Sequence, residues 1–144
     1  MGNVKDTLIN IHMMCACFNF ASNLTKRQPM STNDSKELVR SFLEAMNNED
    51  FETAKDLVND NFTFDGVMGS RDGAEAYFRD MEKMKFKYDI IKIFGDGDDV
   101  CVLYDIDMGG SQKIFTCGWY HVMYNKLNSL KVVFDPRPLL EKKQ

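Results

Sequence analysis

Few side chains in this sequence combine the types and positions that acid–base or nucleophilic chemistry needs. Asp65 follows a short apolar segment and precedes Gly66, and His121 is the single histidine after residue 30. A carboxylate inside an apolar cavity has a raised pKa and can exchange protons near neutral pH. An Asp before a glycine is also an ordinary turn residue, whose side chain accepts hydrogen bonds from nearby backbone amides. From the residues alone, both interpretations of Asp65 stay open.

The cysteines do not form a metal-binding pattern. Cys15 and Cys17 are one residue apart, and Cys101 and Cys117 lie far from them, which fits no zinc spacing. A chain of 144 residues can bury a core without disulfides, so free thiols in a reducing compartment are expected. No local signature of a Ser-His-Asp triad or a Cys-His dyad surrounds His121. We therefore predict neither a metal nor an organic cofactor.

Aromatic and methionine side chains supply most of the material for a binding site. The sequence has eleven Phe, five Tyr, one Trp and ten Met. Tyr77, Tyr104 and Tyr120 each have a hydroxyl on an aromatic ring, which can orient a ligand in an apolar cavity. Tyrosines packed in a core with satisfied hydroxyls are the alternative. The methionines suit an adaptable pocket wall, and they equally suit an irregular core.

The composition is that of one soluble globular domain and excludes several classes of protein. Hydrophobic residues make up 44% and charged residues 28% of the chain, with a net charge of −4. Lys and Arg form no dense cluster, so nucleic acid is not an expected partner. The apolar run at 7–20 is too short to cross a bilayer, so no membrane partner is expected.

The first 29 residues differ in texture from the rest. Lys5 is offset by Asp6 and no Ala-x-Ala site follows, so a secretory signal is poorly matched. Met30 begins a polar segment that leads into a helix, as a natural start would. We expect residues 1–29 to be an extension outside the fold, residues 30–144 to be the domain, and the protein to be cytoplasmic. A degenerate signal or anchor is the alternative.

Periodicity predicts helices first and antiparallel strands afterwards, which is an α+β arrangement with the helices packed on one sheet face. Val39, Phe42 and Met46 recur at helical spacing on the first helix. Three helices are expected before residue 85, and a loop is expected from Gly66 to Gly73. The expected helices are 34–46, 51–58 and 74–84, and the expected strands are 62–65, 88–94, 100–108, 113–124 and 129–134.

Alternation assigns the strand residues to two faces. On the strand at 100–108, Val102 and Tyr104 share the side expected to face the core or a pocket. The strand at 113–124 is apolar on both sides, and its other side carries Phe115, Trp119 and His121. A sheet face with Trp and Phe is usually covered. We therefore expect a homodimer through this outer face.

Three segments resemble the SnoaL-like branch of the nuclear transport factor 2-like superfamily, over nearly all of residues 33–140. LVRSFLEAMNNEDFETAKDLVNDNFTFDG is similar to the opening of SnoaL-like and ketosteroid isomerase-like domains, and GDGDDVCVLYDID and VVFDPRPLL resemble later segments. The resemblance implies a cone-shaped, curved antiparallel sheet that encloses a pocket with three helices from the N-terminal half. The family includes isomerases, polyketide cyclases, epoxide hydrolases and dehydratases as well as binders, so it implies a pocket and not a reaction.

The resemblance to ketosteroid isomerase-like enzymes can be carried over position by position. Asp65 matches their carboxylate base. Phe42 stands where they have a tyrosine oxyanion donor, and Gly118 stands where they have an acidic one. Removing one oxyanion donor costs about 2.7–4 kcal/mol of transition-state stabilisation. Isomerisation by that mechanism is therefore not expected.

Three functions follow as hypotheses. The first is a pocket protein that binds a small hydrophobic or aromatic molecule. The second is a cofactor-independent isomerase, lyase or cyclase with Asp65 as acid or base, and the third is a dimeric protein-interaction module. The residues expected at the pocket are Phe42, Met46, Asp65, Tyr77, Met81, Val102, Tyr104, Gly118, Tyr120, Val132 and Phe134.

Overall fold

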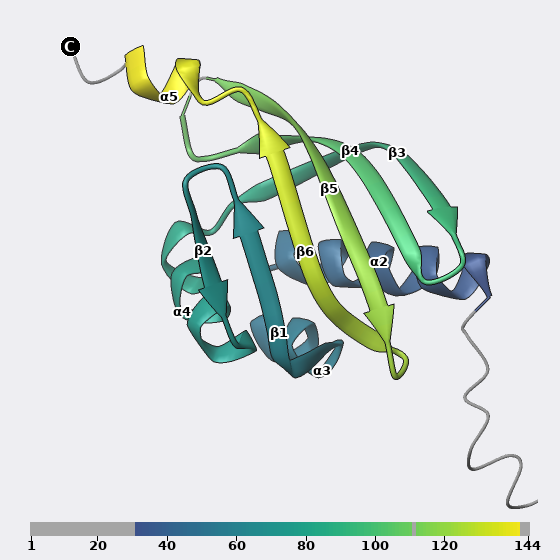
Figure 1. The fold of residues 1–144 in the computed structure, drawn as a ribbon. Helices are drawn as coiled ribbons and strands as arrows, with labels where there is room; N and C mark the ends of the chain where they lie inside the picture. Colours follow the sequence, from purple (N-terminus) through teal and green to yellow (C-terminus); the bar gives the residue numbers. More distant parts are fainter. Residues whose placement is uncertain (1–30, 111, 142–144) are drawn as a thin grey trace, which may run out of the picture.

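A six-stranded curved sheet with helices on one side makes up the fold (Figure 1). The computed structural model describes residues 31–110 and 112–141. The predicted extension, residues 1–29, lies outside the described residues. The α+β fold class with helices in the N-terminal half is confirmed. Among the described residues, no helix is long and apolar enough to cross a membrane.

The first two helices each begin after an N-cap residue whose side-chain oxygen accepts a backbone hydrogen bond. The Ser31 hydroxyl accepts a hydrogen bond from the Asp34 backbone at 3.2 Å, and the Asp50 carboxylate accepts one from the Thr53 backbone at 3.2 Å. A left-handed residue, Lys85, ends the third helix. The helices are α2 (Thr32–Asn47), α3 (Phe51–Asp56), α4 (Ala74–Met84) and α5 (Arg137–Leu140).

The sheet has the spatial order β2-β1-β6-β5-β4-β3, and β1 runs parallel to β6 while all other neighbours are antiparallel. Tyr124 and Asn125 have φ of 57° and 60°, as expected for the two-residue turn that joins β5 to β6. The strands are β1 (Val58–Gly66), β2 (Gly69–Asp72), β3 (Lys87–Asp96), β4 (Asp99–Asp107), β5 (Lys113–Met123) and β6 (Lys126–Phe134).

Two local predictions were wrong around β1. The second helix ends at Asp56, and the polar residues after it belong to the strand. Backbone pairing overrides the turn preference there, because the Leu127 amide donates to the Leu57 carbonyl at 2.9 Å and Val58 lies opposite Leu127. The expected loop contains the short strand β2, which pairs with β1 although all its side chains are exposed.

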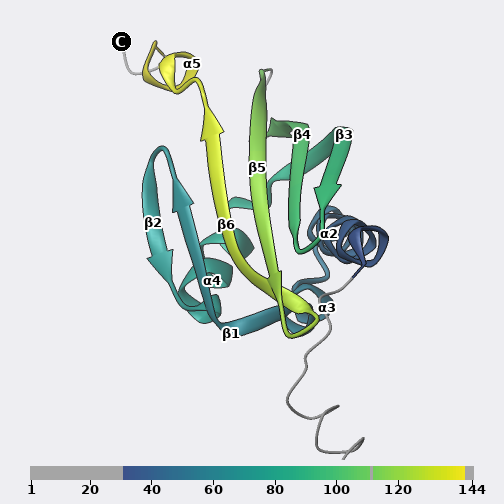
Figure 2. The same ribbon diagram turned by 45° about the vertical axis from the view of Figure 1, so that its right-hand side comes forward.

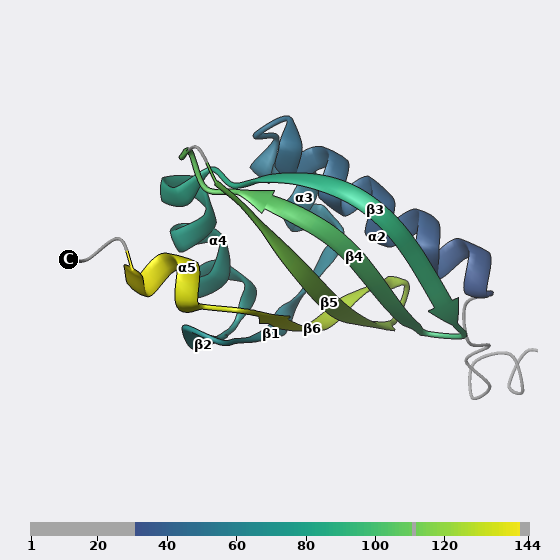
Figure 3. The ribbon, with the colours of Figure 1, turned by 90° about the horizontal axis from the view of Figure 1, so that it is seen from above.

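Alternation sorts the strand side chains as predicted on β4 and β5. Val102 and Tyr104 are buried on the side that faces the helices, which we call the inner face. The other side, the outer face, leaves Phe115 58% and Trp119 52% exposed. Figures 2 and 3 show α2, α3 and α4 together on the inner side of the curved sheet. The sheet therefore encloses a core on one side only.

Candidate ligand pocket

A pocket of about 390 Å³ lies between α4, the β1–β2 hairpin, the inner face of β4 and β6, and the short helix α5. Its wall is mainly apolar, with tyrosine hydroxyls inside and one pair of charged residues. The lining residues are Phe64, Gly66, Val67, Met68, Gly69, Arg71, Tyr77, Asp80, Met81, Met84, Phe86, Tyr88, Tyr104, Ile106, Met108, Leu130, Val132, Phe134 and Leu139.

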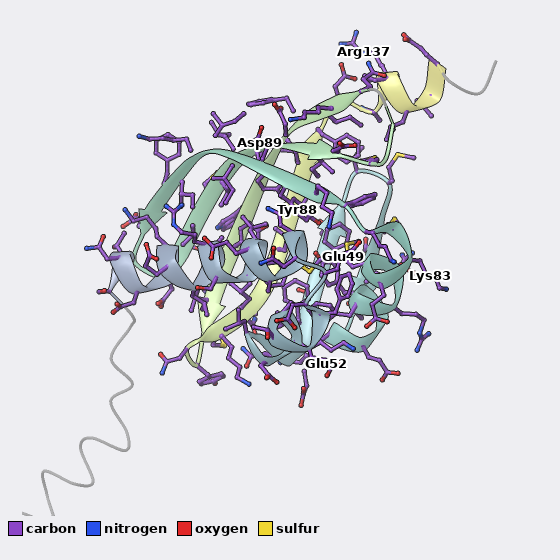
Figure 4. The ribbon with its side chains drawn as sticks, turned by 180° about the vertical axis from the view of Figure 1, so that it is seen from behind. Glu49, Glu52, Lys83, Tyr88, Asp89 and Arg137 are labelled. Carbon is purple, nitrogen blue, oxygen red and sulfur yellow. The ribbon has the colours of Figure 1, made fainter. Side chains whose placement is uncertain are left out.

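Four tyrosines form a cluster at the buried side of this pocket. Tyr77 comes from α4, Tyr88 from β3, Tyr104 from β4 and Tyr120 from β5. The rings of Tyr88 and Tyr104 pack edge to face with centroids 5.4 Å apart. Figure 4 shows Tyr88 on β3 beside the end of α2, where Asn47 donates to its backbone carbonyl at 2.8 Å. Elements distant in sequence thus bring the four phenols together.

Burial keeps the phenols of this cluster uncharged. It raises the pKa of Tyr77, Tyr88, Tyr104 and Tyr120. The hydroxyls of Tyr77 and Tyr88 are hydrogen-bonded to each other, as are those of Tyr104 and Tyr120. The Tyr88 hydroxyl also lies 3.8 Å from the Met81 sulfur, a weak acceptor. The cluster therefore offers neutral hydroxyl groups at physiological pH.

Gly118 belongs to the support of this cluster and not to the pocket wall. A Cβ atom at Gly118 would lie 2.6 Å from the Tyr104 hydroxyl oxygen and 3.1 Å from a ring carbon of Tyr120. The glycine therefore leaves room for the Tyr104 phenol to cross the strand. At the position where the resemblance implies an acidic donor, this chain places a tyrosine hydroxyl from the neighbouring strand.

One ion pair, Arg71 with Asp80, lines the pocket and was not predicted. The Arg71 Nε atom donates to Asp80 Oδ2 at 2.6 Å, and Arg71 Nη1 donates to the Ser70 carbonyl at 2.7 Å. Asp80 lies about one turn after Tyr77 on α4, so both side chains lie on the same side of the helix. This spacing could have predicted Asp80 as a pocket residue. Arg71 gave no signal, because β2 itself was not predicted.

Asp65, the expected acid or base, lies away from the pocket lining. Phe64 lines the pocket, and alternation along β1 turns Asp65 to the outer face, where it is exposed. Its carboxylate lies 3.5 Å from Lys131 Nζ and accepts a hydrogen bond from Ser70 at 3.5 Å. This geometry corrects the sequence-based placement of Asp65 inside an apolar cavity.

The other residues expected at the pocket divide into a lining group and a deeper group. The lining group consists of Tyr77, Met81, Tyr104, Val132 and Phe134. The deeper group is buried in the core behind the lining and consists of Phe42, Met46, Val102 and Tyr120. Phe42 packs edge to face on Tyr120, with ring centroids 6.2 Å apart, so it supports the tyrosine cluster from α2.

On the outer face, a charged group lies among exposed apolar side chains. Asp99 accepts hydrogen bonds from Trp119 Nε1 at 3.0 Å, and its Oδ1 atom lies 2.9 Å from His121 Nδ1. The hydrogen bond with His121, aided by Trp119, lowers the pKa of Asp99. Among the residues that the structure describes, no group of three or more His, Cys, Asp or Glu side chains is arranged to hold a metal ion.

Comparisons with known proteins agree with this geometry. The sequence model of the SnoaL-like domain matches residues 39–127. An NTF2-like protein of unknown function from Cytophaga hutchinsonii is 49% identical, with a TM-score of 0.72 over 80% of this chain and 98% of that one. A comparison with curated proteins gave no match.

Two further solved structures are similar in fold alone. An LEH-like epoxide hydrolase from M. tuberculosis is 22% identical, with a TM-score of 0.68 over 76% of this chain and 89% of that one. A de novo designed protein with a curved β-sheet is 15% identical, with a TM-score of 0.67 over 78% and 96% of the two chains. The curved sheet thus occurs in proteins of very different origin.

Proposed function

This chain belongs to the SnoaL-like family, and from that premise we propose that its pocket binds a small hydrophobic or aromatic molecule with a hydrogen-bond acceptor at one end. The observation that carries the proposal is the convergence of three neutral phenols, Tyr77, Tyr88 and Tyr104, on a mainly apolar wall. An apolar pocket with a few convergent polar groups is the usual form of a small-molecule site.

Size and lining support a ligand of a few rings. The volume of about 390 Å³ lies within the range of roughly 300–1,000 Å³ found for ligand pockets. Four methionines line the wall, and their unbranched, polarisable side chains can adapt to a flat molecule. They are Met68, Met81, Met84 and Met108.

The tyrosine hydroxyls favour an acceptor such as a ketone oxygen at the inner end of the ligand. A hydroxyl whose only other hydrogen-bond acceptor is a thioether sulfur forms a stronger hydrogen bond when a carbonyl oxygen of a ligand replaces that sulfur, because sulfur is a weak acceptor. Tyr88 is in this position beside Met81, at 3.8 Å. The net gain from one such hydrogen bond is about 0.5–1.5 kcal/mol.

A matched pair of probes tests the proposal by calorimetry. We expect 2-acetylnaphthalene, which has a ketone oxygen, to bind more tightly than 2-ethylnaphthalene, which lacks it, by about 2- to 12-fold. Tyr88→Phe should reduce this difference. Equal affinity for the two compounds would contradict a ligand with an acceptor at its inner end. If neither compound binds, the proposed binding function is contradicted.

A pocket-blocking variant separates binding in the pocket from binding elsewhere. Met84 lines the pocket and is 43% exposed, and Met123 lies outside the lining and is 40% exposed. Met84→Trp should abolish binding of 2-acetylnaphthalene, whereas Met123→Trp should leave it intact. If both variants lose binding, or if neither does, the probe does not bind in this pocket.

A second candidate function, a metal-free isomerase, lyase or cyclase, rests on Asp80 and not on Asp65. Asp80 lines the pocket, and Arg71 holds its Oδ2 atom at 2.6 Å. Within the described part of the chain, no hydrogen bond reaches the Oδ1 atom, which leaves it available to a proton on a bound molecule. The carboxylate is thus fixed in orientation by one oxygen and open at the other.

Deuterium exchange at the carbon next to the ketone of 2-acetylnaphthalene tests this second function. In heavy water, NMR should show exchange that the protein accelerates and that Asp80→Asn removes. Asp65→Asn is the matched control, since that carboxylate lies outside the pocket lining. Exchange that depends on Asp65 would contradict the assignment, and binding without exchange would leave the protein a binder.

A further inference from the structure

Two cysteines on neighbouring strands bring their sulfur atoms close together on the outer face. Cys101 lies on β4 and Cys117 on β5, and their Sγ atoms are 3.2 Å apart. Both residues are free and partly buried. Cys15 and Cys17 precede the described residues, so only the pair on the sheet has a defined geometry.

Sheet register explains this proximity. Cys101 lies opposite Trp119, and Leu103 lies opposite Cys117, so the cysteines are diagonal neighbours in an antiparallel pair. The side chains of diagonal neighbours on one face are within reach of each other. A disulfide bond is about 2.05 Å long, so the sulfurs must approach by roughly 1.1 Å to be joined.

We propose that Cys101 and Cys117 form a redox-active dithiol that closes to a cross-strand disulfide when it meets a peroxide. One thiolate attacks a peroxide oxygen of hydrogen peroxide, which gives a sulfenic acid and hydroxide. The second thiol then attacks the sulfenic sulfur and releases water. In sum, two thiols and one hydrogen peroxide give one disulfide and two waters, so the protein loses two protons and two electrons.

The surroundings make this site slow near neutral pH and faster in alkali. Burial, with the neighbouring Cys117 thiol, raises the pKa of Cys101 to about 11. Thiolate is the reacting form, so the rate should rise as the pH rises toward that value. Trp119 lies directly opposite Cys101, so its fluorescence reports on closure.

The test uses the full chain with Cys15→Ser and Cys17→Ser, so that only the pair remains. After treatment with hydrogen peroxide, the mass of the peptides that contain Cys101 and Cys117 should show the loss of two hydrogens without oxygen on either cysteine, and thiol titration of the denatured chain should find neither thiol. Both thiols should return on treatment with dithiothreitol. Oxygen retained on Cys101 or Cys117, intermolecular crosslinks or surviving thiols would overturn the proposal.

A displaced cysteine gives the matched control. In the same background, Cys117→Ser with Phe115→Cys moves the second thiol along β5 to the position opposite Asp105. This variant should gain oxygen on Cys101 and form no internal disulfide, while circular dichroism confirms that it is folded. An internal disulfide in the displaced variant would show that chain flexibility, and not the diagonal register, joins the cysteines.

Discussion

The two faces of β5 are nearly equal in hydrophobicity and opposite in environment. Tyr120 and Val122 are buried on the inner face, whereas Phe115 and Trp119 are more than half exposed on the outer face. Helices and the pocket cover the first face, and within the described chain nothing covers the second. The comparison teaches that alternation assigns sides, while coverage by other elements decides which side is buried.

The faces also differ in their polar chemistry. The inner face has neutral phenols that bond to one another, and the outer face has the Asp99 carboxylate, which is hydrogen-bonded to His121, and the ion pair of Asp65 with Lys131. Burying an unpaired charge costs far more than burying a bonded hydroxyl. The polar groups that the inner face offers to a ligand are therefore neutral hydroxyls. The charged residues of the pocket wall, Arg71 and Asp80, are paired with each other.

Alkaline pH should produce the largest difference between the faces. Each phenol whose pKa is raised in the folded chain ionises first in the unfolded chain, so the contribution of the phenols to stability is retained below about pH 10 and falls above it. At about pH 11, the loss is about 1.4 kcal/mol for one phenol and roughly 6 kcal/mol for all four. Urea unfolding as a function of pH measures this fall.

Tyr88→Phe is the control for that measurement. The variant should lose one phenol's share of the pH dependence, because one ionisable group leaves the cluster. A fall in stability of the same steepness in both proteins would show that other groups cause it.

Gly118→Ala should cost about 1–3 kcal/mol of unfolding free energy, since the new methyl group meets the Tyr104 hydroxyl. Val133→Leu on the outer face adds volume at an exposed position and should change stability by less than about 0.5 kcal/mol. Denaturant unfolding compares the two. Similar costs would mean that the inner face is not tightly packed at Gly118.

Dimerisation through the outer face stays a prediction, and Trp119→Ala tests it. If the face holds a second copy, wild-type protein should show twice the chain mass in light scattering at micromolar concentration. Trp119→Ala should weaken the dimer by about 2 kcal/mol, or roughly 30-fold, as expected for a central aromatic contact. A monomeric wild-type mass would contradict the dimer.

Asp65→Asn should have the smallest effect. The carboxylate forms an exposed ion pair with Lys131 at 3.5 Å, and such pairs contribute about 0–1 kcal/mol. Stability and binding of 2-acetylnaphthalene should both stay close to wild type. A large loss of binding would show that Asp65 contributes to the ligand site after all.

The sequence allowed the inner face to be predicted where alternation is clear. Val102 and Tyr104 were placed correctly because every second residue of β4 is apolar and buried. β2 was missed because its side chains are all exposed, so its pattern is that of a loop. Arg71 with Asp80 was missed for the same reason, since the pair joins that strand to α4.

Asp65 shows how a resemblance and a register can disagree. The resemblance transfers a role to a position on the chain, whereas the side of the sheet on which that side chain lies depends on the pairing of β1 with β6. Phe62 and Phe64 occupy the inner side of β1, which leaves Asp65 the other side. The alternation with Phe62 and Phe64 is visible in the sequence and places Asp65 on the outer face, whereas the role transferred from the isomerases requires it on the inner face.

The contact between Gly118 and Tyr104 also constrains how this pocket can change by mutation. A side chain at position 118 and a phenol at position 104 compete for one volume, so the effect of exchanging either residue depends on which residue stands at the other position. A path from the present pocket to one with an acidic group passes through an intermediate that is overfilled or hollow. Substitutions at positions 104 and 118 should therefore be non-additive, and engineering of the site gains from changing both positions together.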